Sequence, residues 1–136
     1  MVFSYNRPIG LYESTKVPPN SIGTFSGWGC TRVIGRRKEF PNELRSINVP
    51  IINEEDCQRL YNDFATITNE NICTLDEDGK QSSCFGDSGA PLVVSGYLIG
   101  VMSWKKEGKL NPDVFVNVAH PNVRPWILSF LAKFKT

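Results

Sequence analysis

The 136-residue sequence predicts an all-β fold, an antiparallel barrel with a helix at its C-terminal end. Short apolar runs recur along the chain between clusters of turn residues, and this spacing is typical of barrel strands. Close to the C-terminus the spacing of the apolar residues becomes that of one face of an α-helix. These positions are Val123, Ile127, Phe130, Leu131 and Phe134. We therefore expect a single late helix with one apolar face.

Several segments are predicted to form strands of this barrel. Residues 22–28 follow a proline-rich turn, and residues 44–52 alternate polar and apolar side chains until Pro50 interrupts them. Proline has no N–H to donate, so we expect an edge or a bulge at that position. Residues 93–98 are predicted to form a hairpin that leads into a strand over 99–103.

A short helix is expected directly after the second of these strands. Asn53 is a suitable N-cap, because its side chain can accept hydrogen bonds from the first free N–H groups. The acidic residues 54–56 then suit the positive end of the helix dipole. We expect this helix to carry Cys57.

Composition excludes several classes of function. The chain is 40% hydrophobic and 11% aromatic, as in an ordinary globular protein, and its length suits one domain. Its net charge is +1, whereas proteins that bind nucleic acid or membrane surfaces usually carry clustered basic charge. The one basic cluster, residues 36–38, is expected in an exposed loop. No apolar run reaches the ~18 residues of a transmembrane span. We expect no nucleic-acid or membrane partner, no cofactor and no metal.

The segment 82–93, Ser-Ser-Cys-Phe-Gly-Asp-Ser-Gly-Ala-Pro-Leu-Val, is the strongest functional signal. It places Ser88 on a tight turn between Gly86 and Gly89 that runs into a buried strand. Glycine lets the backbone take conformations that a side chain forbids and lets a substrate carbonyl approach closely. The N–H groups of Gly86 and Ser88 would then form an oxyanion hole. Taken alone, Gly-Asp-Ser-Gly is also favourable turn chemistry between two strands.

This segment resembles the nucleophile motif of chymotrypsin-like (trypsin-family) serine proteases, from which it departs only by Ala90 in place of a glycine. Further segments resemble the family's motifs, in the order that the family requires. They are Ser26-Gly27-Trp28-Gly29, Cys57 with Cys73, Leu98 to Trp104, Pro112 to Phe115 and the terminal helix. The resemblance covers nearly all of residues 8–134. Within the family, the sequence most resembles arthropod chymotrypsins and collagenolytic members.

The resemblance implies a fold with definite boundaries. Residues 21–120 would form the six-stranded antiparallel Greek-key barrel that is the second half of the family's double barrel. Residues 1–20 would be a remnant of the linker between the two barrels. Residues 121–136 would form the C-terminal helix.

The resemblance also implies a serine endopeptidase with Ser88 as its nucleophile. A serine hydroxyl needs a histidine base, oriented by an aspartate, to take its proton. The only histidine is His120, which we expect to lie exposed at the start of the terminal helix, far from Ser88. The family's histidine and aspartate precede the segment that residues 7–11 resemble. We therefore expect an inactive C-terminal fragment that lacks both residues and whose missing partner is the N-terminal barrel.

A second interpretation belongs to a different class of function. The chain would be a non-catalytic serine protease homologue that acts as a binding or regulatory module. The unusual Lys105, the missing family cysteines and the absent base favour this interpretation, whereas the retained Ser88 argues against it.

Five residues match substrate-binding positions of the family: Ser82, Ser103, Trp104, Lys105 and Asp113. Ser82 takes the base of the pocket, where trypsin-like members carry aspartate, so the usual preference for arginine and lysine is not expected. A carboxylate at Asp113 would accept a basic side chain or bind water beneath an apolar one, unless it is an exposed turn residue. Where Lys105 stands, the family commonly has glycine. A long cation there would narrow the entrance or reach Asp113, and either effect would alter or abolish the cleavage preference.

Asp87 matches a family residue that needs a partner of opposite charge. It pairs with the N-terminal ammonium that zymogen cleavage creates, and this pair organises the oxyanion hole. We expect no such terminus in this chain, so Asp87 would need another partner or water.

Four cysteines allow three pairings when all are bridged. The resemblance implies a bridge between Cys57 and Cys73. Cys30 and Cys84 lack their family partners, and our hypothesis is that they bridge each other, because the loop after the Trp-Gly pair lies near the nucleophile loop in the family.

The family resemblance and the cysteines together imply a secreted, extracellular protein that meets polypeptide substrates or protein inhibitors. Residues 1–6 themselves lack the features of a signal peptide.

Overall fold

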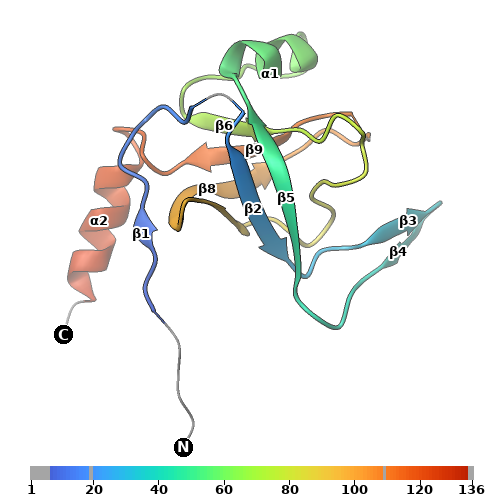
Figure 1. Ribbon diagram of the computed structural model, residues 1–136, viewed down its shortest axis with the longest axis horizontal. Helices are drawn as coiled ribbons and strands as arrows, with labels where there is room; N and C mark the ends of the chain where they lie inside the picture. The colour runs from blue at the N-terminus through green and yellow to red at the C-terminus, as the bar shows by residue number, and fades with distance from the viewer. Residues whose placement is uncertain (1–6, 19, 109, 135–136) are drawn as a thin grey trace, which may run out of the picture.

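A closed barrel of six antiparallel strands forms the body of the protein in this computed structural model, which describes residues 7–18, 20–108 and 110–134 (Figure 1). The strands are β2 (Ile22–Gly27), β5 (Arg45–Ile52), β6 (Asn71–Thr74), β7 (Pro91–Val94), β8 (Tyr97–Trp104) and β9 (Asp113–Asn117). The barrel closes because β8 pairs with both β7 and β9. The predicted all-β barrel is therefore confirmed.

The strand order follows a Greek-key pattern. Strands β2, β5 and β6 pair in chain order, and so do β7, β8 and β9. Strand β7 then returns to pair with β2, while β9 pairs with β6. The chain must therefore cross from β6 to β7 through a long connection, residues 75–90, and this connection contains most of the nucleophile segment.

Alternate side chains of the strands fill the barrel. Val49 and Ile51 of β5 point into it, and Phe25 of β2 meets a phenylalanine of β9 edge-to-face at 5.5 Å between ring centroids. The buried core consists of Phe25, Val49, Ile51, Ile72, Leu92, Val94, Ile99, Met102 and Phe115. The bulge expected at Pro50 does not form. Pairing of β5 with β2 ends opposite Pro50 and pairing with β6 begins at Ile51, so the proline lies at the junction of the two ladders.

Helix α1 (Glu54–Tyr61) begins where the sequence predicts. The side chain of Asn53 accepts a hydrogen bond from the N–H of Asp56 at 2.7 Å, and the first turn is acidic. Cys57 and Tyr61 are one helical turn apart and are both buried, so this face of α1 packs on the barrel.

The basic cluster at residues 36–38 is exposed as expected, but it lies in a hairpin of two short strands, β3 (Arg32–Ile34) and β4 (Arg37–Glu39), and not in a loop. Gly35 makes the turn with a positive φ of +61°. An exposed ion pair between Arg32 of β3 and Glu39 of β4 joins the two strands, and Arg37 pairs with the same glutamate from within β4. The hairpin projects away from the barrel on the right of Figure 1.

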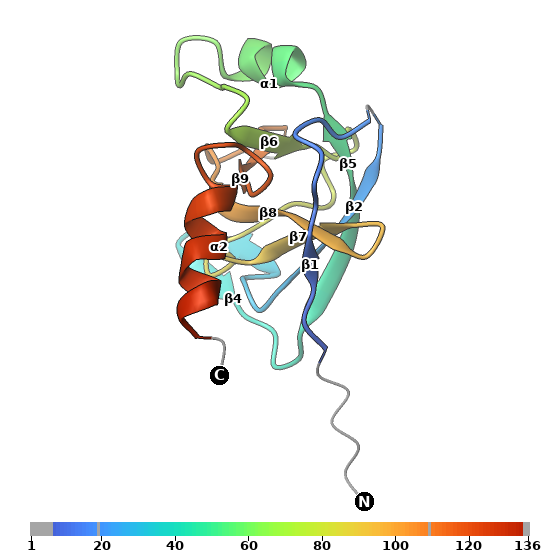
Figure 2. The ribbon, with the colours of Figure 1, turned by 90° about the vertical axis from the view of Figure 1, so that its left-hand side faces the viewer.

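Strand β1 (Gly10–Leu11) and helix α2 (Arg124–Lys133) lie together on the opposite side of the barrel (Figures 1 and 2). Strand β1 pairs in parallel with β8. The guanidinium of Arg124 donates to the carbonyl of Tyr12 at 3.2 Å, which ties the helix to the segment after β1. Parts of the predicted linker (1–6 and Pro19) and of the predicted helical segment (135–136) lie outside the described residues, as does Lys109.

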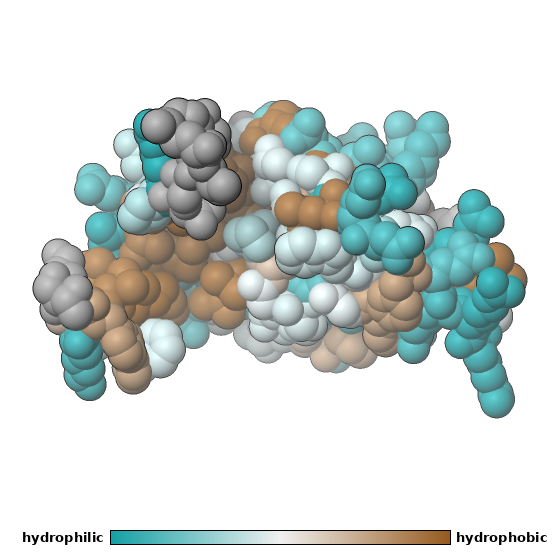
Figure 3. All heavy atoms as spheres, turned by 90° about the horizontal axis from the view of Figure 1, so that it is seen from below, coloured by the Kyte–Doolittle hydropathy of each residue, from teal (hydrophilic) through white to brown (hydrophobic). Residues whose placement is uncertain are grey.

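The apolar residues of α2 are not buried on the barrel. Its exposed large apolar residues, with the one that follows it, are Trp126, Leu128, Phe130, Leu131 and Phe134. Trp126 is 62% exposed, and its ring lies tilted against that of Phe130, at 4.8 Å between ring centroids. Apolar side chains also gather on the left of Figure 3, the side on which Figure 1 places α2. Among the described helices, none is long and apolar enough to cross a bilayer.

Candidate active site

The predicted nucleophile turn, residues 86–89, comes at the end of the connection between β6 and β7, and backbone hydrogen bonds anchor it to β8. The N–H of Gly89 donates to the carbonyl of Met102 at 2.9 Å, and the N–H of Met102 donates to the carbonyl of Ala90 at 2.9 Å. Gly86 and Gly89 have φ angles of +97° and +84°, which residues with side chains rarely adopt. The turn leaves Ser88 exposed to solvent.

Two backbone amides are available beside the Ser88 hydroxyl. No described residue accepts a backbone hydrogen bond from the N–H of Gly86 or of Ser88, and both residues are exposed. Free N–H groups at a nucleophile can stabilise the negative charge that develops on an attacked carbonyl oxygen. The arrangement therefore leaves both donors of the predicted oxyanion hole unoccupied.

Asp87 is buried beneath this turn and joins it to the loop after β2. Its Oδ1 accepts from the N–H of Gly29 at 2.9 Å, and its Oδ2 accepts from the N–H of Cys84 at 2.9 Å. A Cβ atom on Gly27 or Gly29 would overlap the carboxylate, which explains the two glycines of the Ser-Gly-Trp-Gly motif. Within the described chain, no cation lies at ion-pair distance from Asp87.

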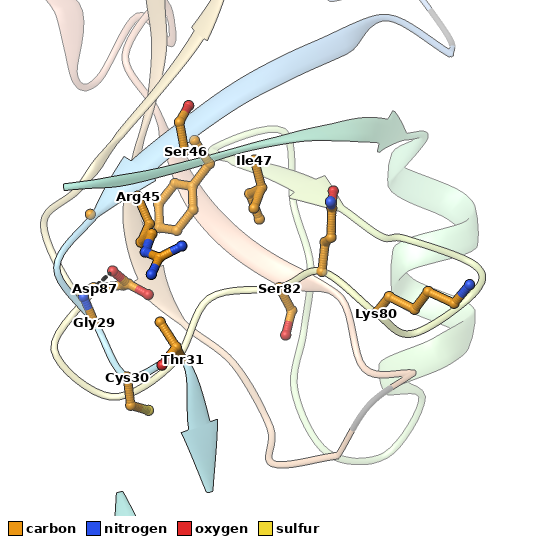
Figure 4. A pocket seen from close by; sticks show the side chains of 12 residues that line it. Gly29, Cys30, Thr31, Arg45, Ser46, Ile47, Lys80, Ser82 and Asp87 are labelled. Atoms are coloured by element: carbon orange, nitrogen blue, oxygen red, sulfur yellow. Dashed lines mark hydrogen bonds between the residues drawn. The ribbon is translucent and has the colours of Figure 1, made fainter. Parts of the chain in front are cut away.

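A hollow of about 250 Å³ opens beside Asp87 (Figure 4). It is bordered by β2 and the loop after it, by the start of β5 and by the segment that precedes the nucleophile turn. In Figure 4 the charged ends of Asp87 and Arg45 both turn toward this hollow. Ser82, which the resemblance places at the base of the substrate pocket, is exposed and also lines it.

A disulfide joins Cys30 to Cys84, with 5.2 Å between their Cα atoms, and a second joins Cys57 to Cys73, with 6.3 Å. These are the two pairs expected from the sequence. The first bridge lies two residues before Gly86 and fastens the nucleophile segment to the base of the β3–β4 hairpin. The N–H of Cys30 also donates to the carbonyl of the residue after Cys84 at 2.9 Å.

Asp113 is a buried residue and not an exposed turn residue. Its Oδ2 accepts from the N–H of Ser83 at 2.8 Å, and its Oδ1 accepts from the Ser83 hydroxyl at 2.7 Å. The ammonium of Lys105 lies 3.7 Å from the same Oδ1. Of the two effects expected of Lys105, the structure shows that it reaches Asp113. Ser83, which sequence reasoning did not single out, is the residue that joins the nucleophile segment to Asp113.

Trp104 lies half-buried in an aromatic cluster beside the end of β8, while Ser103 is exposed. The Trp104 ring is 4.9 Å from that of Tyr61 and 6.1 Å from that of Phe64, measured between centroids. The Tyr61 hydroxyl donates to the carbonyl of Pro112 and accepts from the backbone N–H after Lys105. Burial raises the pKa of Tyr61 above its ordinary value of 10.0. Sequence reasoning missed Tyr61, although its spacing from Cys57 places both on one face of α1.

We expected His120 to be exposed, but it is buried, with 8% of its surface accessible. Its Nε2 lies 3.0 Å from the Oδ1 of Asn69, and its Nδ1 accepts from the N–H of Asn122 at 3.0 Å. A side chain from a remote segment and a nearby backbone N–H therefore hold the ring in the turn before α2. None of these partners belongs to the nucleophile segment.

A family model described as Trypsin matches residues 3–127. The chain belongs to the trypsin family. Among curated trypsin-family proteins, Kallikrein-1 of Mus musculus is 34% identical to it over 131 residues, and Trypsin-2 of Salmo salar is 36% identical over 135 residues. These alignments cover 93% and 96% of this chain, but 47% and 54% of the two relatives. The chain thus spans about half the length of the trypsin-family relatives it matches.

A solved structure of the trypsin family has the same fold. It is neuropsin, described as a serine protease expressed in the limbic system of mouse brain. The two structures superpose with a TM-score of 0.79 at 29% sequence identity. The superposition covers 92% of this chain and 54% of neuropsin.

Proposed function

We propose that this chain is the C-terminal barrel of a serine-type endopeptidase with Ser88 as its nucleophile. The observation that supports the proposal is an exposed serine beside two backbone N–H groups that no described residue accepts from, on a turn held by Asp87 and by a disulfide. The Oγ atom would bond to the carbon of a peptide carbonyl. The N–H groups of Gly86 and Ser88 would donate hydrogen bonds to the carbonyl oxygen and stabilise the negative charge that develops on it. Loss of the amine would leave an ester on Ser88, which water would hydrolyse.

The proton of Ser88 would go to a base outside these 136 residues. The single histidine of the sequence, His120, is held by Asn69 and Asn122. We propose that a histidine and an aspartate of an N-terminal barrel complete the triad and that the present residues alone are inactive. An N-terminal ammonium entering the hollow beside Asp87 would give this buried carboxylate a partner of opposite charge.

An extracellular setting belongs to the same proposal. Both bridges together use all four cysteines, and disulfides persist mainly in oxidising compartments. The expected partners are polypeptide substrates and protein inhibitors that meet the exposed face around Ser88.

A second candidate function is that of a non-catalytic homologue that binds other proteins. The observation that favours it is the ion pair of Lys105 with Asp113, which occupies the region expected to take a substrate side chain. A protein of this kind would keep the barrel and its surface without turning over peptides.

A fluorophosphonate probe separates the two candidates, because it forms a covalent bond only with an activated serine. In the native protein we expect a single adduct, located by peptide mass analysis at Ser88. The variant Ser88→Ala should lose the adduct and nearly all peptide hydrolysis and keep its melting temperature. Ser129→Ala, which removes an exposed hydroxyl on α2, is the matched control and should label like the parent. Absence of any adduct would favour the non-catalytic homologue.

A further inference from the structure

We propose that Lys105 closes the substrate side-chain pocket, so that this site accepts peptides with a small uncharged side chain and rejects basic and large aromatic ones. The inference rests on the proposed function and names its substrate class. Three observations carry it: the position of Asp113, the burial of Lys105 and the balance of charge between them.

Asp113 belongs to the site of the nucleophile. Ser83 precedes Ser88 in the same segment, and it gives Asp113 two hydrogen bonds, one from its N–H and one from its hydroxyl. Asp113 also begins β9, whose second residue pairs with Trp104 at the end of β8. The carboxylate therefore lies where the nucleophile segment meets the end of β8. A side chain of a peptide bound at Ser88 that enters between these two segments would approach this carboxylate.

Lys105 already occupies this place. Only 14% of its side chain is exposed, and only 3% of the side chain of Asp113. Lysine normally keeps its ammonium in water, because the ammonium is strongly hydrated. Here most of the side chain is buried and its ammonium lies 3.7 Å from a buried carboxylate, so the four-carbon stem and the charged end fill space that a large substrate side chain would need.

The charges of the site are also balanced without a substrate. Asp113 receives two hydrogen bonds from Ser83, and the ammonium of Lys105 lies at ion-pair distance from it. A guanidinium or ammonium from a substrate would therefore meet a compensated carboxylate and a nearby like charge. A large aromatic side chain would have to separate the buried pair, which leaves an uncompensated charge. A small uncharged side chain requires neither change.

The next residue provides an internal comparison. Lys106 is exposed, and its ammonium lies 5.0 Å from the ring centroid of Phe64, on the outside of the aromatic cluster. Two adjacent lysines thus have opposite environments, one turned into the site and one turned out of it. Replacement of Lys106 is the matched control for replacement of Lys105.

The test measures binding of p-aminobenzamidine, a small aromatic amidinium, to the native-length protein that carries Ser88→Ala, so that no catalysis is needed. Adding Lys105→Ala should tighten binding by at least about tenfold, because it opens the pocket and frees the carboxylate. Adding Lys106→Ala should leave binding as weak as in the Ser88→Ala parent. Equal binding by the parent and by the Lys105→Ala variant would overturn the proposal.

A second measurement uses the unmodified protein, because Lys105→Ala leaves Asp113 without its cation and is expected to lower stability. Peptide thioesters that differ only in having alanine, lysine or phenylalanine before the reacting bond are compared by kcat/KM. We expect the alanine thioester to be preferred by about tenfold or more, and a preference for either of the others would overturn the inference. If no thioester reacts and no fluorophosphonate adduct forms, the proposed function fails, while amidinium binding still decides whether Lys105 closes the pocket.

Discussion

At the scale of the residue, the carboxylate of Asp87 decides which neighbours can carry a side chain. Gly27 and Gly29 lie against it, and a Cβ atom at either position would overlap its oxygens. The Ser-Gly-Trp-Gly motif is recognisable in the sequence, but its physical reason is not, because Gly29 and Asp87 are distant along the chain and meet only in the fold. The bonds from Ser83 to Asp113 escape local pattern analysis for the same reason.

Replacing Gly29 with alanine should displace Asp87 from beneath the nucleophile turn. The displaced carboxylate would lose its hydrogen bond from the Gly29 N–H, so we expect the free energy of unfolding to fall by about 2 kcal/mol. Denaturant unfolding of the native-length protein measures the change. Gly35→Asn is the control, because no atom lies within 4 Å of a Cβ there and asparagine tolerates a positive φ. An equal loss in both variants would contradict the role of Asp87.

Tyr61 should make stability depend on pH in the alkaline range. Burial is the main cause of its raised pKa; the hydrogen bond from the Lys106 N–H opposes the rise and the charge of Asp113 adds to it. Because the folded pKa exceeds the unfolded value of 10.0, the contribution of the neutral phenol is complete below pH 10.0 and is lost as pH rises through the folded pKa.

We therefore expect Tyr61→Phe to flatten the fall in the free energy of unfolding above about pH 10. Denaturant titrations at a series of alkaline pH values measure this slope. Tyr97→Phe, at an exposed tyrosine, is the control. An unchanged slope in Tyr61→Phe would show that another group causes the alkaline loss.

At the scale of the element, local signals predict local structure and fail where a partner is remote. Asn53 caps α1 as expected, because cap and helix lie within one turn. The β3–β4 hairpin was not expected, since the ion pair that joins its strands, Arg32 with Glu39, exists only once the two strands are aligned. The apolar period near the C-terminus predicts α2 correctly, but a period shows which residues share a face and not what covers that face. His120 illustrates the same limit, because Asn69 comes from a different segment.

The two disulfides should have different consequences when they are removed. The bridge from Cys57 to Cys73 closes a short loop with a sequence separation of 16, so its loss should cost about 3 kcal/mol of stability. The bridge from Cys30 to Cys84 spans a separation of 54 and should cost about 4 kcal/mol. Only the second fastens the segment that carries Gly86.

We therefore expect the double variant Cys30→Ser/Cys84→Ser to react with the fluorophosphonate more slowly than the parent by about tenfold, at a temperature where both are folded. The double variant Cys57→Ser/Cys73→Ser is the control and should lose stability while keeping the rate. The rate of adduct formation is the measurement. Equal rates in the two double variants would mean that the Cys30–Cys84 bridge does not position the nucleophile turn.

At the scale of the whole molecule, the barrel has a buried core and yet leaves an apolar surface on α2. Trp126, Phe130 and Leu131 are exposed there, and contiguous exposed apolar surface is typical of a face that another body covers. The closed barrel was predictable from strand spacing and resemblance together. The uncovered side of the molecule was not predictable from the period of α2 alone.

The isolated 136 residues should self-associate through this face. We expect sedimentation velocity to show species that grow with protein concentration, and the double variant Trp126→Ser/Leu131→Ser to shift them toward the monomer. Val33→Ser, which removes an exposed apolar side chain from the hairpin on the other side of the barrel, is the control. A wild-type chain that remains monomeric at all concentrations would contradict the prediction.

The Cys30–Cys84 bridge has a consequence for limited proteolysis of the β3–β4 hairpin. Cys30 precedes the hairpin and Cys84 follows it, so a cut between Arg36 and Arg37 divides the chain into two polypeptides that remain covalently joined. Projecting hairpin tips are preferred sites of nicking. The nicked protein would migrate as one species until it is reduced, and the segment with Ser88 would stay attached to the piece that carries β2. A cut at this projecting tip would thus release no part of the protein until the bridge is reduced.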